Sequence, residues 1–249
     1  MMTLRQLAAE PNTLPTRTTW YLTDLAEARG KQELFTRQSP QKLKVLREHA
    51  FVESAVSSNR IEGVEVDKSR VATLMFGKSA LLDRDEEEVR GYRDALRLIH
   101  EQGAKLPITE ATIKRLHKLC RGEIWDAGVY KEKDVDIIQK YADGRSRVRF
   151  KTVPAKQTPK AMGELIELWQ RGVREKWVHP LILAAALNLD FLCIHPFRDG
   201  NGRASRLLFL LACYHCGIEA GRYVSLERMS IVRAGDFARV TAASNPSTN

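Results

Sequence analysis

Between residues 195 and 206 the sequence brings together groups that could handle phosphate. The stretch reads His-Pro-Phe-Arg-Asp-Gly-Asn-Gly-Arg-Ala-Ser-Arg. Its two glycines, Gly200 and Gly202, tolerate the positive φ angles at which successive backbone N–H groups point into one concavity. A helix predicted to begin just after them adds the positive end of its dipole to the same place. The stretch therefore predicts an anion cradle that fits phosphate groups.

Charged side chains accompany this cradle. Arg203 and Arg206 lie three residues apart, so both guanidinium groups can reach one anion. Asp199 offers hard oxygen ligands suited to Mg²⁺, and His195 is a base that titrates near neutrality. Each of these residues alone is more often structural, but together they meet the requirements of phosphoryl or nucleotidyl transfer.

The elements that must position this loop are mostly helices. Thr109, Gly103 and Pro180 supply start and stop signals. Apolar residues recur at helical spacing, and two such stripes are Leu43, Leu46, Ala50, Phe51 and Ala55, and Val89, Tyr92, Leu96 and Ile99. The predicted helices span residues 40–61, 86–102, 109–120, 159–175, 180–194 and 202–216. Between residues 134 and 153 the helical spacing of apolar residues stops. Two short β-type runs (135–141 and 147–153) flank Ala142-Asp143-Gly144-Arg145, which is a strong hairpin signal.

Composition narrows the class of protein. The 249 residues carry 40 Lys and Arg against 31 Asp and Glu, a net charge of +9, spread along the chain. The longest apolar run, 181–194, is interrupted by Asn188 and Asp190 and is shorter than the roughly 20 residues of a membrane span. The first residues lack the apolar core of a secretory signal. We therefore expect a soluble, cytoplasmic protein with no membrane partner.

The four cysteines include a C-x-x-C pair, Cys213 and Cys216. A zinc site would need two further ligands at suitable spacing. Because the pair falls at the end of a predicted apolar helix, buried reduced thiols are favoured over a redox or metal pair.

The stretch HPFRDGNGRASR resembles the signature of the Fic family, H-x-F-x-D/E-G-N-G-R-x-x-R, at every specified position. The resemblance extends from about residue 36 to residue 228. It implies a mostly α-helical Fic fold, a helical bundle with a β-hairpin flap. It also implies three parts: an N-terminal helical region (1–100) with an inhibitory helix at about 40–63, a catalytic core (101–228), and a divergent or truncated C-terminal tail (229–249).

The family implies a role for each residue of the motif. His195 would deprotonate a protein hydroxyl, and Asp199 would hold Mg²⁺ against the phosphates of ATP. Gly200, Asn201 and Gly202 would cradle the α- and β-phosphates. Arg203 would bind the β-phosphate and Arg206 the γ-phosphate. The resemblance thus implies a protein adenylyltransferase that moves AMP from ATP to a Ser, Thr or Tyr side chain.

The related Doc branch transfers phosphate instead. It carries alanine and lysine where this chain has Gly200 and Gly202, which favours AMP transfer here. The motif does not settle the donor nucleotide.

A second stretch, Ser58-Asn59-Arg60-Ile61-Glu62-Gly63, resembles the inhibitory motif of the family, S/T-x-x-x-E-G/N. By itself a glutamate before a helix-ending glycine is usually solvent-facing. The resemblance implies instead that Glu62, with Ser58, pairs with Arg206 and blocks productive ATP binding. A charge-assisted pair contributes about 1.5–3 kcal/mol, so inhibition would be substantial but leaky. In some relatives the same glutamate supports removal of AMP, which the sequence leaves open.

The hairpin occupies the place of the family's target-binding flap. Ile137, Ile138 and Lys140 would line a target strand, with Arg147 and Arg149 on the other strand. An ordinary amphipathic hairpin is an equally good interpretation.

Two other functions compete with transfer. The net charge and the basic run 145–151 could serve a nucleic-acid-binding regulator, although no nucleic-acid-binding motif is apparent. A non-catalytic Fic fold acting as an interaction partner conflicts with the intact motif residues. Nucleic acid is therefore not the expected partner, and a homodimer stays open because some relatives self-associate.

Overall fold

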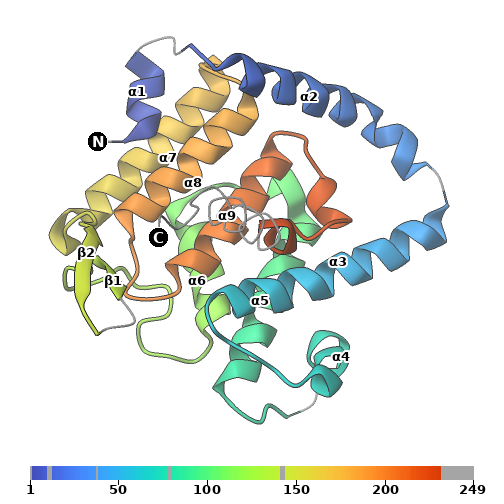
Figure 1. Cartoon of the computed structure of the whole chain (residues 1–249), viewed down its shortest axis with the longest axis horizontal. Helices are drawn as coiled ribbons and strands as arrows, with labels where there is room; N and C mark the ends of the chain where they lie inside the picture. The colour runs from blue at the N-terminus through green and yellow to red at the C-terminus, as the bar shows by residue number, and fades with distance from the viewer. Residues whose placement is uncertain (1, 10–12, 38, 78–79, 141–143, 231–249) are drawn as a thin grey trace, which may run out of the picture.

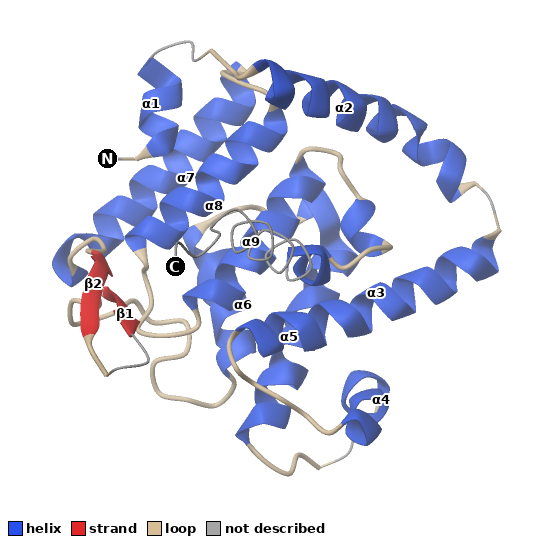
Figure 2. Ribbon diagram, viewed as in Figure 1, coloured by secondary structure: helices blue, strands red, loops and turns tan. Residues whose placement is uncertain are grey.

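The computed structural model describes residues 2–9, 13–37, 39–77, 80–140 and 144–230, and it is mostly helical. Figures 1 and 2 show the helices gathered around a central α9, with the two strands at one edge. The long elements are α2 (Thr16–Thr36), α3 (Pro40–Ile61), α5 (Arg84–Gln102), α6 (Glu110–Arg121), α7 (Thr158–Glu175), α8 (Pro180–Ile194) and α9 (Asn201–His215). Shorter ones are α1 (Thr3–Ala9), α4 (Lys68–Phe76), β1 (Ile137–Lys140), β2 (Ser146–Phe150) and the 3₁₀ turns η1 (Gly103–Lys105), η2 (Ala155–Gln157) and η3 (Ala220–Arg222).

The predicted helices around the motif form, and their ends follow from side-chain chemistry. Asp83 caps α5 by accepting the Glu86 N–H, and Thr109 caps α6 by accepting the Thr112 N–H. Gly103, at φ +54°, ends α5 as predicted. Helices α3 and α8 have the predicted bounds, and α7 and α9 begin one residue before theirs.

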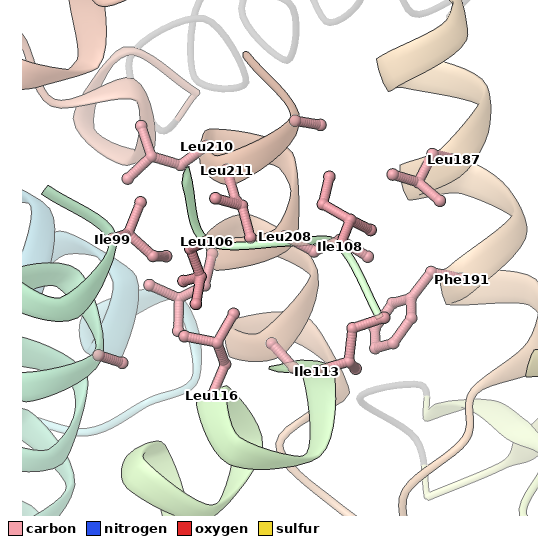
Figure 3. Packing of buried hydrophobic residues seen from close by; sticks show 14 of the residues in the cluster. Ile99, Leu106, Ile108, Ile113, Leu116, Leu187, Phe191, Leu208, Leu210 and Leu211 are labelled. Carbon is pink, nitrogen blue, oxygen red and sulfur yellow. The ribbon is translucent and has the colours of Figure 1, made fainter. Parts of the chain in front are cut away.

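The core lies where α5, α6 and α8 pack against α9. Its buried side chains include Ile99, Leu106, Ile113, Phe191 and Leu208, and Figure 3 shows several of them converging on α9. The α5 stripe predicted from spacing, which runs through Val89, Tyr92, Leu96 and Ile99, is buried. Because α8 and α9 pack along each other, the loop between them is held at one end of the bundle.

The hairpin is confirmed, with shorter strands than predicted. Strands β1 and β2 are antiparallel, and Ile138 pairs with Val148. Both predicted runs extended further, but the backbone leaves the ladder before Thr152, whose hydroxyl turns back to the Val135 carbonyl. Ala142 and Asp143 of the predicted turn lie outside the described residues, as does most of the predicted C-terminal tail (231–249).

Three helices, α1, α2 and α4, were not individually predicted. Helix α2 has little contact with the core: no residue of it whose burial the structure describes is buried, and Trp20 and Leu34 are exposed on it. Helices α1 and α4 bury only Leu4 and the pair Leu74 and Met75. The expected apolar stripe of α3 is buried in part, because Ala50 and Ala55 are buried and Phe51 is partly buried. Leu46 is exposed, whereas the buried face of α3 consists largely of small polar residues: Ser54, Ser57, Ser58 and Asn59.

No helix among the described residues is long and apolar enough to cross a membrane. The four cysteines are free thiols. Cys213 is buried on α9 as predicted, but Cys216 follows the last helical residue and is only partly covered.

Candidate active site

The loop between α8 and α9 turns through two left-handed residues. His195 ends α8 at φ 53°, and its N–H still bonds to the Phe191 carbonyl at 2.9 Å. Gly200 begins α9 at φ +76°. A Cβ on Gly200 would lie 2.8 Å from Arg121 Cδ and 3.1 Å from His117 Nε2, so this position needs glycine for both its conformation and its close contacts. The loop is therefore packed tightly against α6.

Asn201 and Phe197 hold the inner side of the loop. The Asn201 amide accepts the Phe197 N–H at 2.9 Å and donates to the Phe197 carbonyl at 2.8 Å. Phe197 itself is fully buried. The Asn201 side chain thus stabilises the loop conformation, and the phosphate-binding role implied by the resemblance stays a prediction.

His117, on α6, supports the loop from below. Its ring stacks on Phe197 with 3.7 Å between ring centroids and 5° between planes. Its Nδ1 accepts the Gly128 N–H at 2.9 Å, which leaves Nε2–H to donate to the Asp199 carbonyl at 2.8 Å. Burial lowers the pKa of His117 to about 4. At neutral pH this neutral imidazole therefore fixes the backbone beside Asp199.

His195 is placed to act as a base. Burial lowers its pKa, with the Leu192 carbonyl, Asp199 and Glu62 acting in the opposite direction. Its Nδ1 is buried without a hydrogen-bond partner that meets ordinary geometry among the described residues. Nε2 is then the ring nitrogen available for proton transfer, and the lowered pKa keeps it unprotonated at neutral pH.

Asp199 lies at the mouth of the cradle. Its side chain is 61% exposed, with Oδ1 accepting the Gly200 N–H at 2.6 Å and Oδ2 lying 2.9 Å from Arg121 Nη1. Among the described residues no three His, Cys, Asp or Glu side chains cluster as a metal site would need. An exposed carboxylate beside an anion cradle therefore fits a cation whose other ligands are phosphate oxygens and water, rather than a metal bound by protein alone.

The Arg203 side chain does not point toward the cradle, where binding of the β-phosphate would require it. It is only 3% exposed, and its Nη1 donates to Glu88 on α5 and to Asn59 on α3. The guanidinium therefore faces the packed interior between α3 and α5. Phosphate binding by Arg203 stays a prediction, and in this structure the side chain anchors α9.

Arg206, by contrast, points at the end of α3. Its Nε donates to Ser58 Oγ at 2.8 Å, and its Nη2 donates to the Ser58 carbonyl at 3.0 Å and to Glu62 Oε1 at 2.7 Å. A Cβ on Gly202 would lie 2.2 Å from Glu62 Oε1. The Glu62 carboxylate thus lies directly over the first turn of α9, where the sequence predicts a phosphate.

A cavity of about 390 Å³ adjoins Arg206. It is lined by Ala185, Asn188, Leu189, Leu192, Arg206, Phe209, Leu226, Glu227 and Ser230. Asn188 Oδ1 is buried and has no hydrogen-bond partner within the described part of the chain. The walls combine apolar side chains with the polar residues Arg206, Glu227 and Ser230, a mixture that is common in pockets for small molecules.

The flap is tied to the loop through Lys131. Its backbone N–H bonds to the Pro196 carbonyl at 2.9 Å, and its buried ammonium bonds to Ile194 and to Thr152. Burial lowers the pKa of Lys131. The exposed residues of the hairpin include Ile138 and Val148. Binding of a target strand by Ile137, Ile138 and Lys140 stays a prediction.

The structure brings together most of the predicted site: His195, Asp199, Gly200, Gly202, Arg206, Ser58 and Glu62. The sequence analysis missed four supporting residues, namely Glu88, His117, Arg121 and Lys131. His117 and Arg121 are four residues apart, which places both of them on the same face of α6. Nothing in the sequence shows that this face meets the loop.

Comparison with known proteins agrees with this geometry. Residues 107–213, which begin just before α6 and end within the last turn of α9, match the family model described as the Fic/DOC family. "Protein adenylyltransferase Fic" of Drosophila persimilis is 26% identical over 185 residues, which cover 69% of this chain and 33% of that protein. The chain thus spans about a third of the length of the curated relatives it matches.

Solved structures show the same fold. A Fic-domain-containing signaling protein from Bacteroides thetaiotaomicron superposes with a TM-score of 0.66 at 26% identity, over 78% of this chain and 72% of that one. A Fic family protein from Desulfovibrio desulfuricans gives 0.69 at 25% identity, over 94% and 68%. Glu62 and Glu88 lie outside the family match, whereas the whole loop lies within it. Residues 107–213 of this chain therefore match the Fic/DOC family, and the chain has the fold of these Fic proteins.

Proposed function

We propose that this chain transfers AMP from ATP to the hydroxyl group of a Ser, Thr or Tyr side chain in a target protein. The observation that supports the proposal is the 195–206 loop, in which an imidazole, an exposed carboxylate and the N-terminus of α9 lie within a few residues of one another. Residues 101–228 would form the catalytic core, with the inhibitory segment in the N-terminal helical region.

In this proposal the backbone N–H groups around Gly200 and Gly202 bind the α- and β-phosphates, and Arg206 binds the γ-phosphate. The cavity beside Arg206 receives the nucleoside. Asp199 would hold Mg²⁺, which supplies positive charge to the phosphate oxygens.

His195 Nε2 accepts the proton of the target hydroxyl as its oxygen attacks the α-phosphorus. A new phosphorus–oxygen bond forms to the target, the bond between the α-phosphorus and the bridging oxygen breaks, and pyrophosphate leaves. The β-hairpin would align the target segment by pairing with it as an added strand.

We also propose that Glu62 restrains this activity. Its carboxylate is paired with Arg206 and lies over Gly202, so the γ-phosphate of ATP would meet a negative charge where it needs a guanidinium. ATP that enters with Glu62 in place would lie in a register unsuited to in-line attack.

The test uses ATP labelled at either the α- or the γ-phosphate, Mg²⁺ and a cell lysate. Wild type, His195→Ala and Glu62→Gly are compared. We expect protein labelling from α-labelled ATP only, raised by Glu62→Gly and lost in His195→Ala. Labelling from γ-labelled ATP would assign the chain to phosphate transfer instead, and equal labelling by Glu62→Gly and wild type would refute the inhibitory role.

Purified protein incubated with ATP, without lysate, separates self-modification from modification of another protein. Release of AMP from a labelled target by wild type but not by Glu62→Gly would add removal of AMP to the activity.

A further inference from the structure

The carboxylate proposed to hold the cation already has a positively charged partner. Arg121 Nη1 lies 2.9 Å from Asp199 Oδ2 and 3.0 Å from Glu88 Oε1. It donates a hydrogen bond to Glu88, and its contact with Asp199 is an ion pair. The second oxygen of Glu88 holds Arg203. Charges of alternating sign therefore run from the buried face of α9 to the mouth of the cradle.

Arg121 is held firmly in this position. Its side chain is 12% exposed, its Cδ lies against Gly200, and its backbone carbonyl accepts a hydrogen bond from Arg84. Beside it, the Glu123 N–H bonds to Glu87 at 3.0 Å. The end of α6 is thus fixed to α5, which holds the guanidinium near Asp199.

We infer that Arg121 is a positioning residue that acts through Asp199: it keeps the affinity of Asp199 for a free divalent cation low, so that a cation binds there mainly together with a triphosphate. This inference rests on the proposed function, because it takes Asp199 as the cation ligand.

The physical reason is charge balance. A guanidinium within ion-pair distance of a carboxylate opposes the approach of a second cation to the same oxygens. The described residues offer no further cluster of acidic side chains to offset that repulsion. The phosphates of ATP would offset it, because they add several negative charges and oxygen ligands at the cradle.

When a cation displaces Arg121 from Asp199, Glu88 remains as a partner for the Arg121 guanidinium. The hydrogen bond to Glu88 remains, so no buried charge is left unpaired, a state that would be strongly unfavourable. Releasing Asp199 then breaks only a partly exposed ion pair, which typically contributes little.

The chain provides a matched control in Arg198. It precedes Asp199 in sequence and carries the same charge, but its nearest carboxylate is that of Asp126, at 3.9 Å. Replacing Arg198 removes one positive charge near the site without removing the ion pair to Asp199.

The experiment measures Mn²⁺ binding by electron paramagnetic resonance, with and without ATP, on the full chain in a His195→Ala background that prevents turnover. Without ATP, Arg121→Gln should bind Mn²⁺ about two- to fivefold more tightly than the parent, the range expected for a partly exposed ion pair. With ATP present, the difference in Mn²⁺ affinity between Arg121→Gln and the parent should be smaller. Arg121→Lys, which keeps the charge, and Arg198→Gln should stay close to the parent.

Two further variants serve as controls for folding and for the role of Asp199. Arg121→Met keeps a long stem in the buried position and should tighten binding as Arg121→Gln does, so a folding failure of one variant leaves the other. Adding Asp199→Asn should abolish the gain.

Equal or weaker Mn²⁺ binding by both neutral variants would overturn the inference, as would an equal gain in Arg198→Gln. If Mn²⁺ binding requires Asp199 but has the same affinity in the parent and the Arg121 variants, the inference is wrong and the proposed function is unaffected. Absence of Mn²⁺ binding from every variant, even with ATP, would remove the inference together with the proposed role of Asp199.

Discussion

The 195–206 loop is held from two sides by contacts of very different kinds. On the α5–α6 side, His117 stacks on a fully buried Phe197, and buried ion pairs join Glu88 to Arg121 and Arg203. On the α3 side, Arg206 contacts Ser58 and Glu62, and the Glu62 side chain is 30% exposed.

The difference indicates which contacts can change in function. Breaking the α5–α6 side would open an aromatic cluster or leave buried charges unpaired, both of which cost several kcal/mol. The Glu62 contact costs little to break, because water and a phosphate group can replace each partner. We therefore expect the first side to determine stability and the second to determine activity.

The largest effect should come from Phe197→Ala. Removing a fully buried aromatic ring typically lowers the free energy of unfolding by about 3–5 kcal/mol. Urea denaturation measures this loss. Phe76→Ala is the control, since Phe76 is 60% exposed and should change stability by less than about 0.5 kcal/mol. Similar values for both variants would contradict a rigid α5–α6 side.

The next effect is a pH dependence due to His117. Its folded pKa is about 4, below the ordinary 6.5, so its neutral form stabilises the fold fully above pH 6.5 and this contribution is lost as pH falls toward 4. The maximum loss is about 3 kcal/mol, from roughly 1.4 kcal/mol per unit of pKa difference.

Unfolding experiments between pH 7.5 and about pH 4 would compare wild type with His117→Gln. The variant should lose less stability on acidification than wild type, whereas His49→Gln, at an exposed position on α3, should follow wild type. An unchanged pH dependence in His117→Gln would refute the role assigned to the neutral imidazole.

On the α3 side, Glu62→Gly should separate activity from stability. We expect AMP transfer to rise by about 10- to 100-fold, as loss of a charge-assisted pair implies, while the free energy of unfolding changes by less than about 1 kcal/mol. Glu65→Gly, an exposed glutamate three residues further on, is the matched control and should leave transfer unchanged. A large loss of stability in Glu62→Gly would show that this contact is structural.

The smallest effect should come from Ser58→Ala. It removes one of the three hydrogen bonds that turn Arg206 toward α3, so transfer should rise about two- to fivefold, the equivalent of up to about 1 kcal/mol. Initial rates of transfer measured over a range of ATP concentrations would give this increase. A fall in transfer would mean that Ser58 orients Arg206 for ATP rather than for Glu62.

The local parts of this protein could be predicted from its sequence. Helix ends at Thr109 and Gly103, the hairpin and the positive φ of Gly200 depend on interactions within a few residues, such as caps and turn conformations. Gly202, by contrast, lies in the first turn of α9 and does not have a positive φ. The α5 stripe was also predicted correctly, because a buried helix face has a regular spacing of apolar residues. The family resemblance added the pairing of Glu62 with Arg206, which spacing alone does not indicate.

Only the tertiary structure decided which partner each charged residue finds. Arg203 and Arg206 lie three residues apart on one helix, yet Arg203 is buried against Glu88 while Arg206 reaches Glu62. His117 and Arg121 support the loop because α6 packs beneath α9, a relation between segments some 80 residues apart. Sequence patterns report periodicity along the chain, whereas ion pairs and ring stacking depend on which helices pack together and at what distance. The sequence by itself therefore determined the chemical groups of this site, and the packing of α3, α5 and α6 around α9 decided which of them are free to act.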